Sequence, residues 1–218
     1  MLKGKKLSIL GDSISTYKGV SDDAGANATL FYNPYFYRPP LPEEKTYWRL
    51  LMDRLSLSLC VNNSYSGGNL SGKADPTSGI SRAGQLSRDD GTEPDLIIVF
   101  MGLNDLGRGF DADLFASDYR QTLLILKESY PRASAVCVTL PDRDPVLRAR
   151  TLLFNEGIES AVREMGKGFF TADLFHSPLN NDTYYNNTLD GLHPDEDGMR
   201  MIAEVIEGAI RENLLKSE

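Results

Sequence analysis

The sequence has 218 residues and a formal net charge of −8 at pH 7, with 31 acidic residues against 23 lysines and arginines. This length predicts a single domain over residues 1–218 that buries its apolar surface without disulfides. The acidic balance argues against a nucleic-acid partner, because phosphates require a basic face. No apolar run approaches the roughly 18 residues of a membrane span, so membrane insertion is not expected.

The first ten residues, "MLKGKKLSIL", are positively charged but contain no apolar core of the length that a signal peptide needs. We therefore expect a cytoplasmic protein, or a secreted one if a leader has been removed.

Five short apolar runs follow one another along the chain, at residues 6–11, 59–64, 95–102, 135–141 and 168–175. Between them, apolar residues recur at helical spacing over residues 44–56, 111–131, 145–165 and from Pro194 onward. Strands that are apolar throughout and alternate with helices indicate a parallel sheet that is covered on both faces. The expected fold class is therefore α/β, a three-layer α/β/α sandwich.

The two cysteines, Cys60 and Cys137, both fall inside predicted strands. Their spacing fits neither a metal site nor a redox pair, so we expect both to be small core residues.

Polar and small residues follow each predicted strand. The segments are Gly11–Asp12–Ser13, "NNSYSGGN", "GLND", "PDRDP" and the stretch that leads to "DGLHP". In doubly wound sheets, sites form outside the carboxyl ends of the strands. The gathering of titratable and small residues at one edge predicts an enzyme.

Ser13 is the candidate nucleophile, and a serine hydroxyl needs a base to take its proton. The chain has only two histidines, and His193 has Asp190 three positions before it, close enough to accept a hydrogen bond from the imidazole. These three residues have the types and roles of a nucleophile, a base and an orienting acid. Three donors could stabilise an oxyanion: the backbone N–H of Ser13, the backbone N–H of Gly67 and the side-chain amide of Asn104.

The blocks "GDSIS", "NNSYSGG", "GLND" and "DGLHP" resemble the four sequence blocks of the SGNH (GDSL-type) hydrolases, in the same order from Gly11 to Pro194. The resemblance implies a flavodoxin-like fold with a five-stranded parallel sheet of order 2-1-3-4-5. It also implies ester hydrolysis through an acyl-serine. Our own expectation is that this reaction needs no cofactor and no metal. Position by position, the resemblance assigns the nucleophile, the acid–base pair and the oxyanion donors to Ser13, Asp190, His193, Gly67 and Asn104. Gly67 is preferred over Gly68 by a register difference of one residue.

Structural alternatives accompany these assignments. Ser13 could instead cap a helix, and Asp12 and Asp105 are better explained as turn or network residues. His193 could be a metal ligand among Asp190, Asp195, Glu196 and Asp197, although acids at a helix start commonly serve as caps. His176 is expected on the surface or in a loop.

An aromatic-rich insertion at about residues 20–45 follows the first strand. Tyr35 and Tyr37, together with Trp48 just beyond the insertion, are candidates for contact with substrate, or else form a small core of the insertion itself. Arg143 could bind an anionic substrate, or could pair with Asp142 or Asp144.

The sequence thus predicts a serine esterase for short acyl groups, for example acetyl on a carbohydrate, with a small-molecule or glycan ester as its partner. One alternative is a non-catalytic glycan-binding module of the same fold. The other is a nucleotide or phosphate binder, which no G-x-G-x-x-G or P-loop pattern supports.

Overall fold

The computed structural model describes residues 2–17, 19–20, 32 and 41–215. Its five strands form one parallel sheet of order β2-β1-β3-β4-β5, as predicted. The strands are β1 (Lys6–Gly11), β2 (Ser58–Ser64), β3 (Leu96–Phe100), β4 (Ser134–Val138) and β5 (Phe169–Ala172). Tyr35 and Tyr37, and most of the aromatic insertion, lie outside the described residues.

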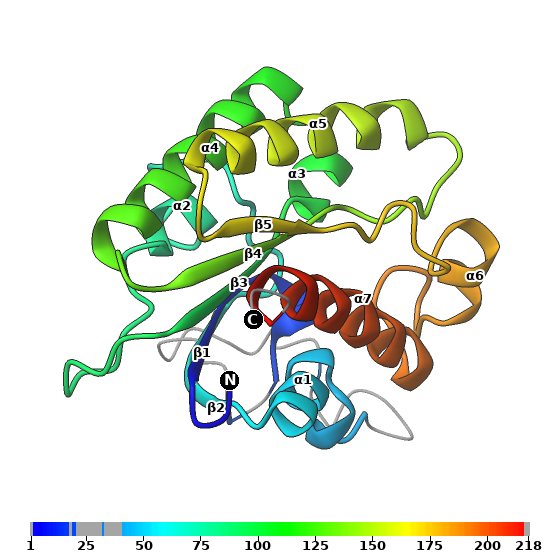
Figure 1. Ribbon diagram of the computed structural model, residues 1–218. Coiled ribbons are helices and arrows are strands. Elements are labelled where there is room, and N and C mark those ends of the chain that lie inside the picture. The colour runs from blue at the N-terminus through cyan, green and yellow to red at the C-terminus, as the bar shows by residue number, and fades with distance from the viewer. Residues whose placement is uncertain (1, 18, 21–31, 33–40, 216–218) are drawn as a thin grey trace.

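Four long helices cover the two faces of the sheet, which confirms the three-layer α/β/α sandwich (Figure 1). Helices α1 (Tyr47–Leu55) and α7 (Glu196–Leu214) pack side by side on one face. Helices α4 (Ala112–Ser129) and α5 (Arg148–Met165) pack together on the other. The short helices are α2 (Gly79–Arg82), α3 (Leu103–Gly107), α6 (Asn181–Asn186), and two 3-10 turns, η1 (Ser13–Ser15) and η2 (Glu43–Lys45).

The inner strands of the sheet are buried in the middle of the molecule, which explains their apolar runs, whereas burial alternates along the edge strands β2 and β5. All five residues of β3 are buried, as are all residues of β1 after Lys6. Both cysteines are buried and unpaired, as expected from their positions in strands. No helix within the described ranges combines the length and the apolar character that a membrane crossing requires.

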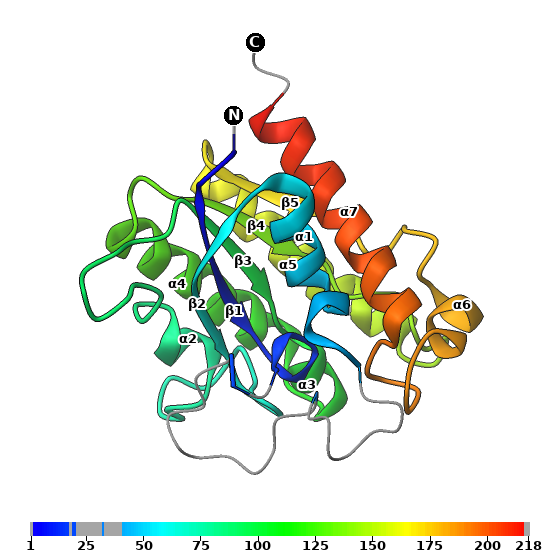
Figure 2. The same cartoon turned by 90° about the horizontal axis from the view of Figure 1, so that it is seen from below.

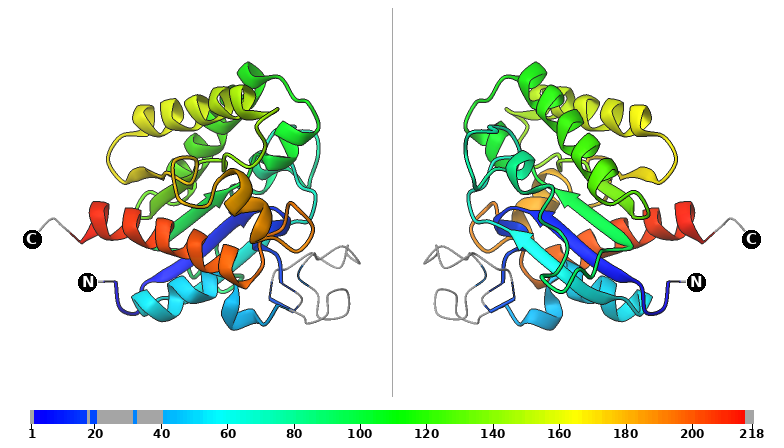
Figure 3. Two further views of the ribbon diagram at one scale, coloured as in Figure 1. Left: turned by 90° about the vertical axis from the view of Figure 1, so that its right-hand side faces the viewer. Right: turned by 90° about the vertical axis from the view of Figure 1, so that its left-hand side faces the viewer.

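The carboxyl ends of the strands lie at one end of the sheet, where α3 and α6 also lie, and the C-terminal end of α7 lies at the opposite end (Figures 2 and 3). The chain passes from β1 outward to β2 and then back to β3 on the other side of β1. Such a reversal opens a crevice beyond the ends of the two inner strands. The segments after β1 and β3 therefore face a common space.

Candidate active site

The turn after β1 presents Ser13. A Cβ atom on Gly11 would lie 2.5 Å from the Cβ of Ser15 and 2.6 Å from Ser64 Oγ, so the close packing of this turn requires glycine. Asp12 then caps η1, because its Oδ1 accepts a hydrogen bond from Ile14 N–H at 3.0 Å. The capping role thus belongs to Asp12, and the hydroxyl of Ser13 is left for another partner.

That partner is His193. Ser13 Oγ lies 2.8 Å from His193 Nε2, although 180 residues separate them in the chain. On the other side of the ring, His193 Nδ1 lies 2.8 Å from Asp190 Oδ2. Ser13 and His193 are each only 8% exposed, so their hydrogen bond is largely shielded from water. The structure brings together the three residues that the sequence predicted as a set.

The loop between α6 and α7 fixes the imidazole. Its two sides pair at Thr188 and Pro194, and Leu189 N–H donates to the carbonyl of His193 at 2.8 Å. Asp190 Oδ1 accepts the backbone N–H of His193 at 2.8 Å, so the acid and the base are bonded through both backbone and side chain. Asp195 caps α7 by accepting from Gly198 N–H, which is the structural role expected of an acid there.

Burial and charge set the protonation of this pair. Burial lowers the pKa of His193, the bond and charge of Asp190 oppose that change, and the positive charge of Arg143 adds to the lowering. Burial alone would raise the pKa of Asp190, but the hydrogen bonds from His193 and Leu192 bring it below its ordinary value. At neutral pH the acid is therefore ionised and the imidazole is neutral, which is the state in which Nε2 can accept a proton.

The three oxyanion donors expected from the sequence each keep an N–H available. Gly67 adopts φ +74°, a conformation that favours glycine, and within the described part of the chain its N–H donates to no other group. The half-buried Asn104 uses one hydrogen of its Nδ2 to bond the carbonyl of Gly68 at 3.0 Å, which leaves the second hydrogen available. Ser13 is the first residue of η1, where a backbone N–H has no intrahelical acceptor.

Two residues hold these donors in place. Asp105 is fully buried and accepts hydrogen bonds from Leu70 N–H at 2.7 Å and Ser71 N–H at 2.9 Å, which confirms its expected network role. Arg82, which sequence reasoning missed, is 5% exposed and donates to the carbonyls of Gly11, Asn63 and Thr77. Burial lowers the pKa of Arg82 to about 10, so its guanidinium stays charged. Together these bonds tie the ends of β1 and β2 to the loop that carries Gly67.

A tyrosine from the aromatic insertion packs on the imidazole, and it is not one of the aromatic residues singled out from the sequence. Tyr32 is 2% exposed, and its ring lies edge-to-face on His193 with centroids 6.3 Å apart. Its hydroxyl donates to the carbonyl of Pro194 at 2.8 Å. The prediction of substrate contact was wrong for Trp48, which has no exposed surface and belongs to the hydrophobic core beneath α1.

Arg143 lies after β4 and pairs with neither of its neighbouring acids. Asp142 instead binds Arg148 and the side chain of Asn181, and Asp144 accepts a bond from Val146 N–H. From the sequence alone, Arg143 could either pair with Asp142 or Asp144 or keep its guanidinium free for a substrate. The structure excludes both of the expected pairs.

No group of three or more His, Cys, Asp or Glu side chains in the described part of the chain is arranged to hold a metal ion. The second histidine, His176, has a side chain that is 70% exposed and lies 2.8 Å from Asp173, as expected of a surface residue.

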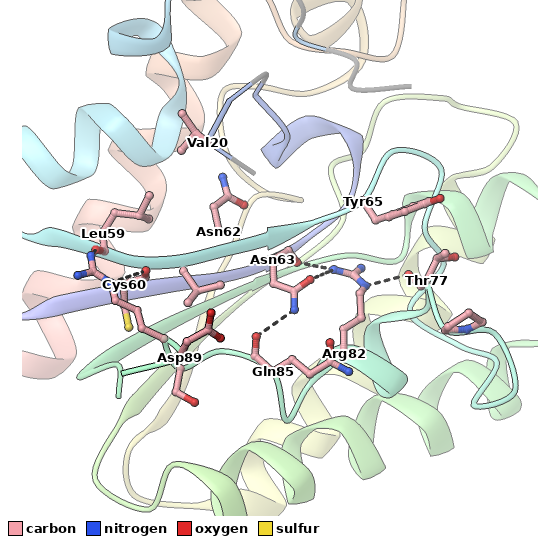
Figure 4. A pocket seen from close by; sticks show the side chains of 14 residues that line it. Val20, Leu59, Cys60, Asn62, Asn63, Tyr65, Thr77, Arg82, Gln85 and Asp89 are labelled. Atoms are coloured by element: carbon pink, nitrogen blue, oxygen red, sulfur yellow. Dashed lines mark hydrogen bonds between the residues drawn. The ribbon is translucent and has the colours of Figure 1, made fainter. Parts of the chain in front are cut away.

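A groove of about 860 Å³ runs along the outer edge of β2 (Figure 4). Neither Ser13, His193 nor Asn104 lines it. Arg82 and Arg88 bond backbone carbonyls of β2 there, which protects an edge strand from pairing with another chain. Tyr65, at one end of the groove, is two residues from Gly67, so the groove borders the oxyanion loop without being part of the site.

Comparison with known proteins identifies the family of the chain. Residues 9–201 match the sequence model of the GDSL-like lipase/acylhydrolase family, and the chain belongs to this family. It is an ester-bond hydrolase, and a nucleophile–base–acid triad with an oxyanion hole is typical of such enzymes. No match was found among curated proteins.

Solved structures share the fold over nearly the whole chain. A Bacteroides ovatus protein described as a GDSL-like lipase is 24% identical, with a TM-score of 0.72 and coverage of 96% of this chain and 99% of that one. A similarly described protein from Bacteroides uniformis is 26% identical, with a TM-score of 0.69 and coverage of 98% and 96%. A family two carbohydrate esterase from Clostridium thermocellum, solved with cellohexaose, is 16% identical, with a TM-score of 0.69 and coverage of 96% and 64%.

Proposed function

We propose that the protein is a serine esterase that cleaves carboxylic esters through an acyl-serine intermediate. The observation that supports this most directly is the run of two 2.8 Å contacts from Ser13 Oγ through the imidazole of His193 to Asp190. A nucleophile, a base and an orienting acid in hydrogen-bond contact are what acyl transfer at a serine requires.

In the first half of the reaction, Ser13 Oγ attacks the carbonyl carbon of the ester and its proton passes to His193 Nε2. Asp190 stabilises the imidazolium that forms, without taking the proton itself. The N–H groups of Ser13 and Gly67 and the free hydrogen of Asn104 bind the oxyanion. When the tetrahedral intermediate collapses, Nε2 returns the proton to the leaving alcohol.

In the second half, His193 activates a water molecule. The water attacks the acyl carbon and gives its proton to Nε2, and Ser13 leaves and recovers that proton. A carboxylic acid is released and the free enzyme is restored. Every proton step uses the same nitrogen, so no metal or cofactor enters the scheme.

The proposed substrates are esters of short acyl groups, in particular acetyl groups on a carbohydrate. The sequence contains no long apolar segment of the kind that would cover a lipid chain. Neighbours of the same fold include carbohydrate esterases of families two and three from Clostridium thermocellum. A series of aryl esters from acetyl to octanoyl, with acetylated sugars alongside, tests this proposal. A preference for octanoyl over acetyl would contradict it.

The mechanism is tested by Ser13→Ala and by a paired comparison of two histidines. His176 and Asp173 repeat the 2.8 Å contact and the three-residue spacing of the His193–Asp190 pair, but His176 is exposed. We expect Ser13→Ala and His193→Ala to abolish hydrolysis of an aryl acetate and His176→Ala to retain it. A fluorophosphonate probe should label Ser13 in the wild type, whereas a glycan-binding module would stay unlabelled and inactive.

A further inference from the structure

Arg143 differs from the other arginines of the described ranges in that its side chain forms no hydrogen bond or ion pair. The others bind carboxylates, an amide oxygen or backbone carbonyls. The chain is acidic overall, with 31 acids against 23 bases, so ion-pair partners are plentiful. An arginine without one in such a chain requires an explanation.

The Nε atom of Arg143 is buried and has no hydrogen-bond partner among the described residues. Burying a charged donor without an acceptor is unfavourable, because the group loses water and gains nothing in return. The residue as a whole is only half-buried, so the guanidinium remains within reach of a ligand. A ligand with an acceptor oxygen would supply the missing partner.

Helix α6 connects the segment that carries Arg143 to the residue before His193. Asn181, the first residue of α6, donates its backbone N–H to the carbonyl of Asp142 at 2.5 Å. Further along α6, the hydroxyl of Tyr184 donates to the carbonyl of Leu192 at 2.7 Å, next to His193. The guanidinium is close enough to act on the pKa values of both His193 and Tyr184.

We propose that Arg143 binds a carboxylate carried by the ester substrate, which makes the enzyme selective for acidic esters such as acyl esters of uronic acids. The proposal rests on the esterase function above and adds the substrate class. A guanidinium presents a planar fork of donors that fits a carboxylate with two parallel hydrogen bonds. The neighbouring acids are occupied elsewhere, since Asp142 binds Arg148 and Asp144 accepts from Val146 N–H.

The test uses two acetyl esters of the same shape, 4-acetoxybenzoate and 4-acetoxybenzamide, which differ in the charge of the leaving alcohol. A second pair, the aryl monosuccinate and the aryl butyrate, places the carboxylate on the acyl side instead. For each pair we measure the ratio of kcat/KM for the anionic and the neutral ester at about pH 8, where histidine is neutral. The comparison of ratios between variants removes differences in intrinsic reactivity.

We expect at least one pair to show a preference for the anionic ester in the wild type and Arg143→Gln to lower that ratio by about 10- to 100-fold. Arg143→Lys keeps the charge without the fork and should recover part of the preference. The matched control is Arg132→Gln, an exposed arginine paired with Glu93, which should leave the ratio unchanged. Equal ratios in the wild type and Arg143→Gln for both pairs would overturn the proposal.

A binding measurement separates failure of this inference from failure of the esterase proposal. Calorimetry with the Ser13→Ala variant compares the same four esters without turnover. If wild-type enzyme hydrolyses none of them, tighter binding of an anionic ester that is lost in Ser13→Ala/Arg143→Gln would still support the carboxylate site. Equal binding of the charged and neutral esters would refute it.

Discussion

The burial of Asp12 predicts how the stability of the folded protein changes with pH. The carboxyl group of Asp12 is 2% exposed. Burial raises its pKa to about 7, and the nearby charge of Asp105 adds to the rise, while the bond from Ile14 N–H and the charge of Arg82 limit it. Because the pKa is higher in the folded state than the unfolded value of 3.8, the folded protein binds this proton more tightly. The resulting stability is fully present below pH 3.8 and is lost as the pH rises through about 7.

The size of this stability change follows from the shift in the pKa of Asp12. Each unit is worth about 1.4 kcal/mol, so the change from 3.8 to about 7 amounts to about 4 kcal/mol in all. About 3 kcal/mol of it falls between roughly pH 5 and pH 8. Asp12→Asn keeps an oxygen that can accept from Ile14 N–H but cannot ionise. As the pH rises from about 5 to about 8, the free energy of unfolding of the variant should therefore increase by about 3 kcal/mol relative to that of the wild type.

Urea denaturation at intervals between about pH 5 and pH 8 measures the difference in free energy of unfolding. Asp111→Asn is the matched control, because Asp111 caps α4 in the same way but is exposed. Its free energy of unfolding is measured at the same pH values, so that the effect of Asp12 can be compared with that of an exposed cap. A constant difference between wild type and Asp12→Asn across the range would refute the reasoning, since it would mean that Asp12 is ionised throughout.

Substitutions at three residues test the groups around Ser13 through initial rates on an aryl acetate. Asp190→Asn removes the carboxylate that holds Nδ1–H of His193, so kcat should fall by roughly 10⁴-fold, and a loss below tenfold would contradict its orienting role. Asn104→Ala removes one oxyanion donor and should lower kcat by about 10²- to 10³-fold with a small change in KM; a loss confined to KM would argue against that role. Tyr32→Phe removes the bond to Pro194 but keeps the ring on His193, so kcat should fall by about 2- to 10-fold, and further in Tyr32→Ala. Equal losses in the two Tyr32 variants would mean that the hydroxyl alone matters.

The sequence predicted the large elements of the fold because they carry the strongest patterns. The inner strands are buried on both sides and therefore form apolar runs in the sequence, while the long helices show an apolar stripe. The short helices α2, α3 and α6 were not predicted, because they contain only four to six residues each. A helix of one or two turns is too short to show periodicity, and tertiary contacts decide whether it forms.

The residues of the proposed triad were predictable because their chemistry limits the residue types and the topology limits their positions. The residues that support them were not. Arg82 donates hydrogen bonds to three backbone carbonyls. Because every residue has a backbone carbonyl, the sequence does not indicate which of them an arginine will bind. Tyr32 is one of several aromatics in the insertion, and only the fold distinguishes the one that meets His193. The Asp–x–x–His pattern also occurs twice with the same local bonds, so burial and the contact with Ser13 separate His193 from His176.

The charged groups around Ser13 differ from the acidic balance of the whole protein. The chain carries a net charge of −8, yet the acids nearest the nucleophile are held in ways that weaken or use their charge. Burial raises the pKa of Asp12 to about 7 and also raises that of Asp105. The carboxylate of Asp190 forms a hydrogen bond with His193 Nδ1. The guanidinium of Arg143 has no such partner, and its positive charge acts on the imidazole against the larger, opposite effect of Asp190. An unpaired guanidinium favours an anionic ligand in a chain whose other charges repel one. Binding of a carboxylate there would also remove the charge that disfavours the imidazolium, so an acidic ester would assist the proton transfer from Ser13 as well as its own binding.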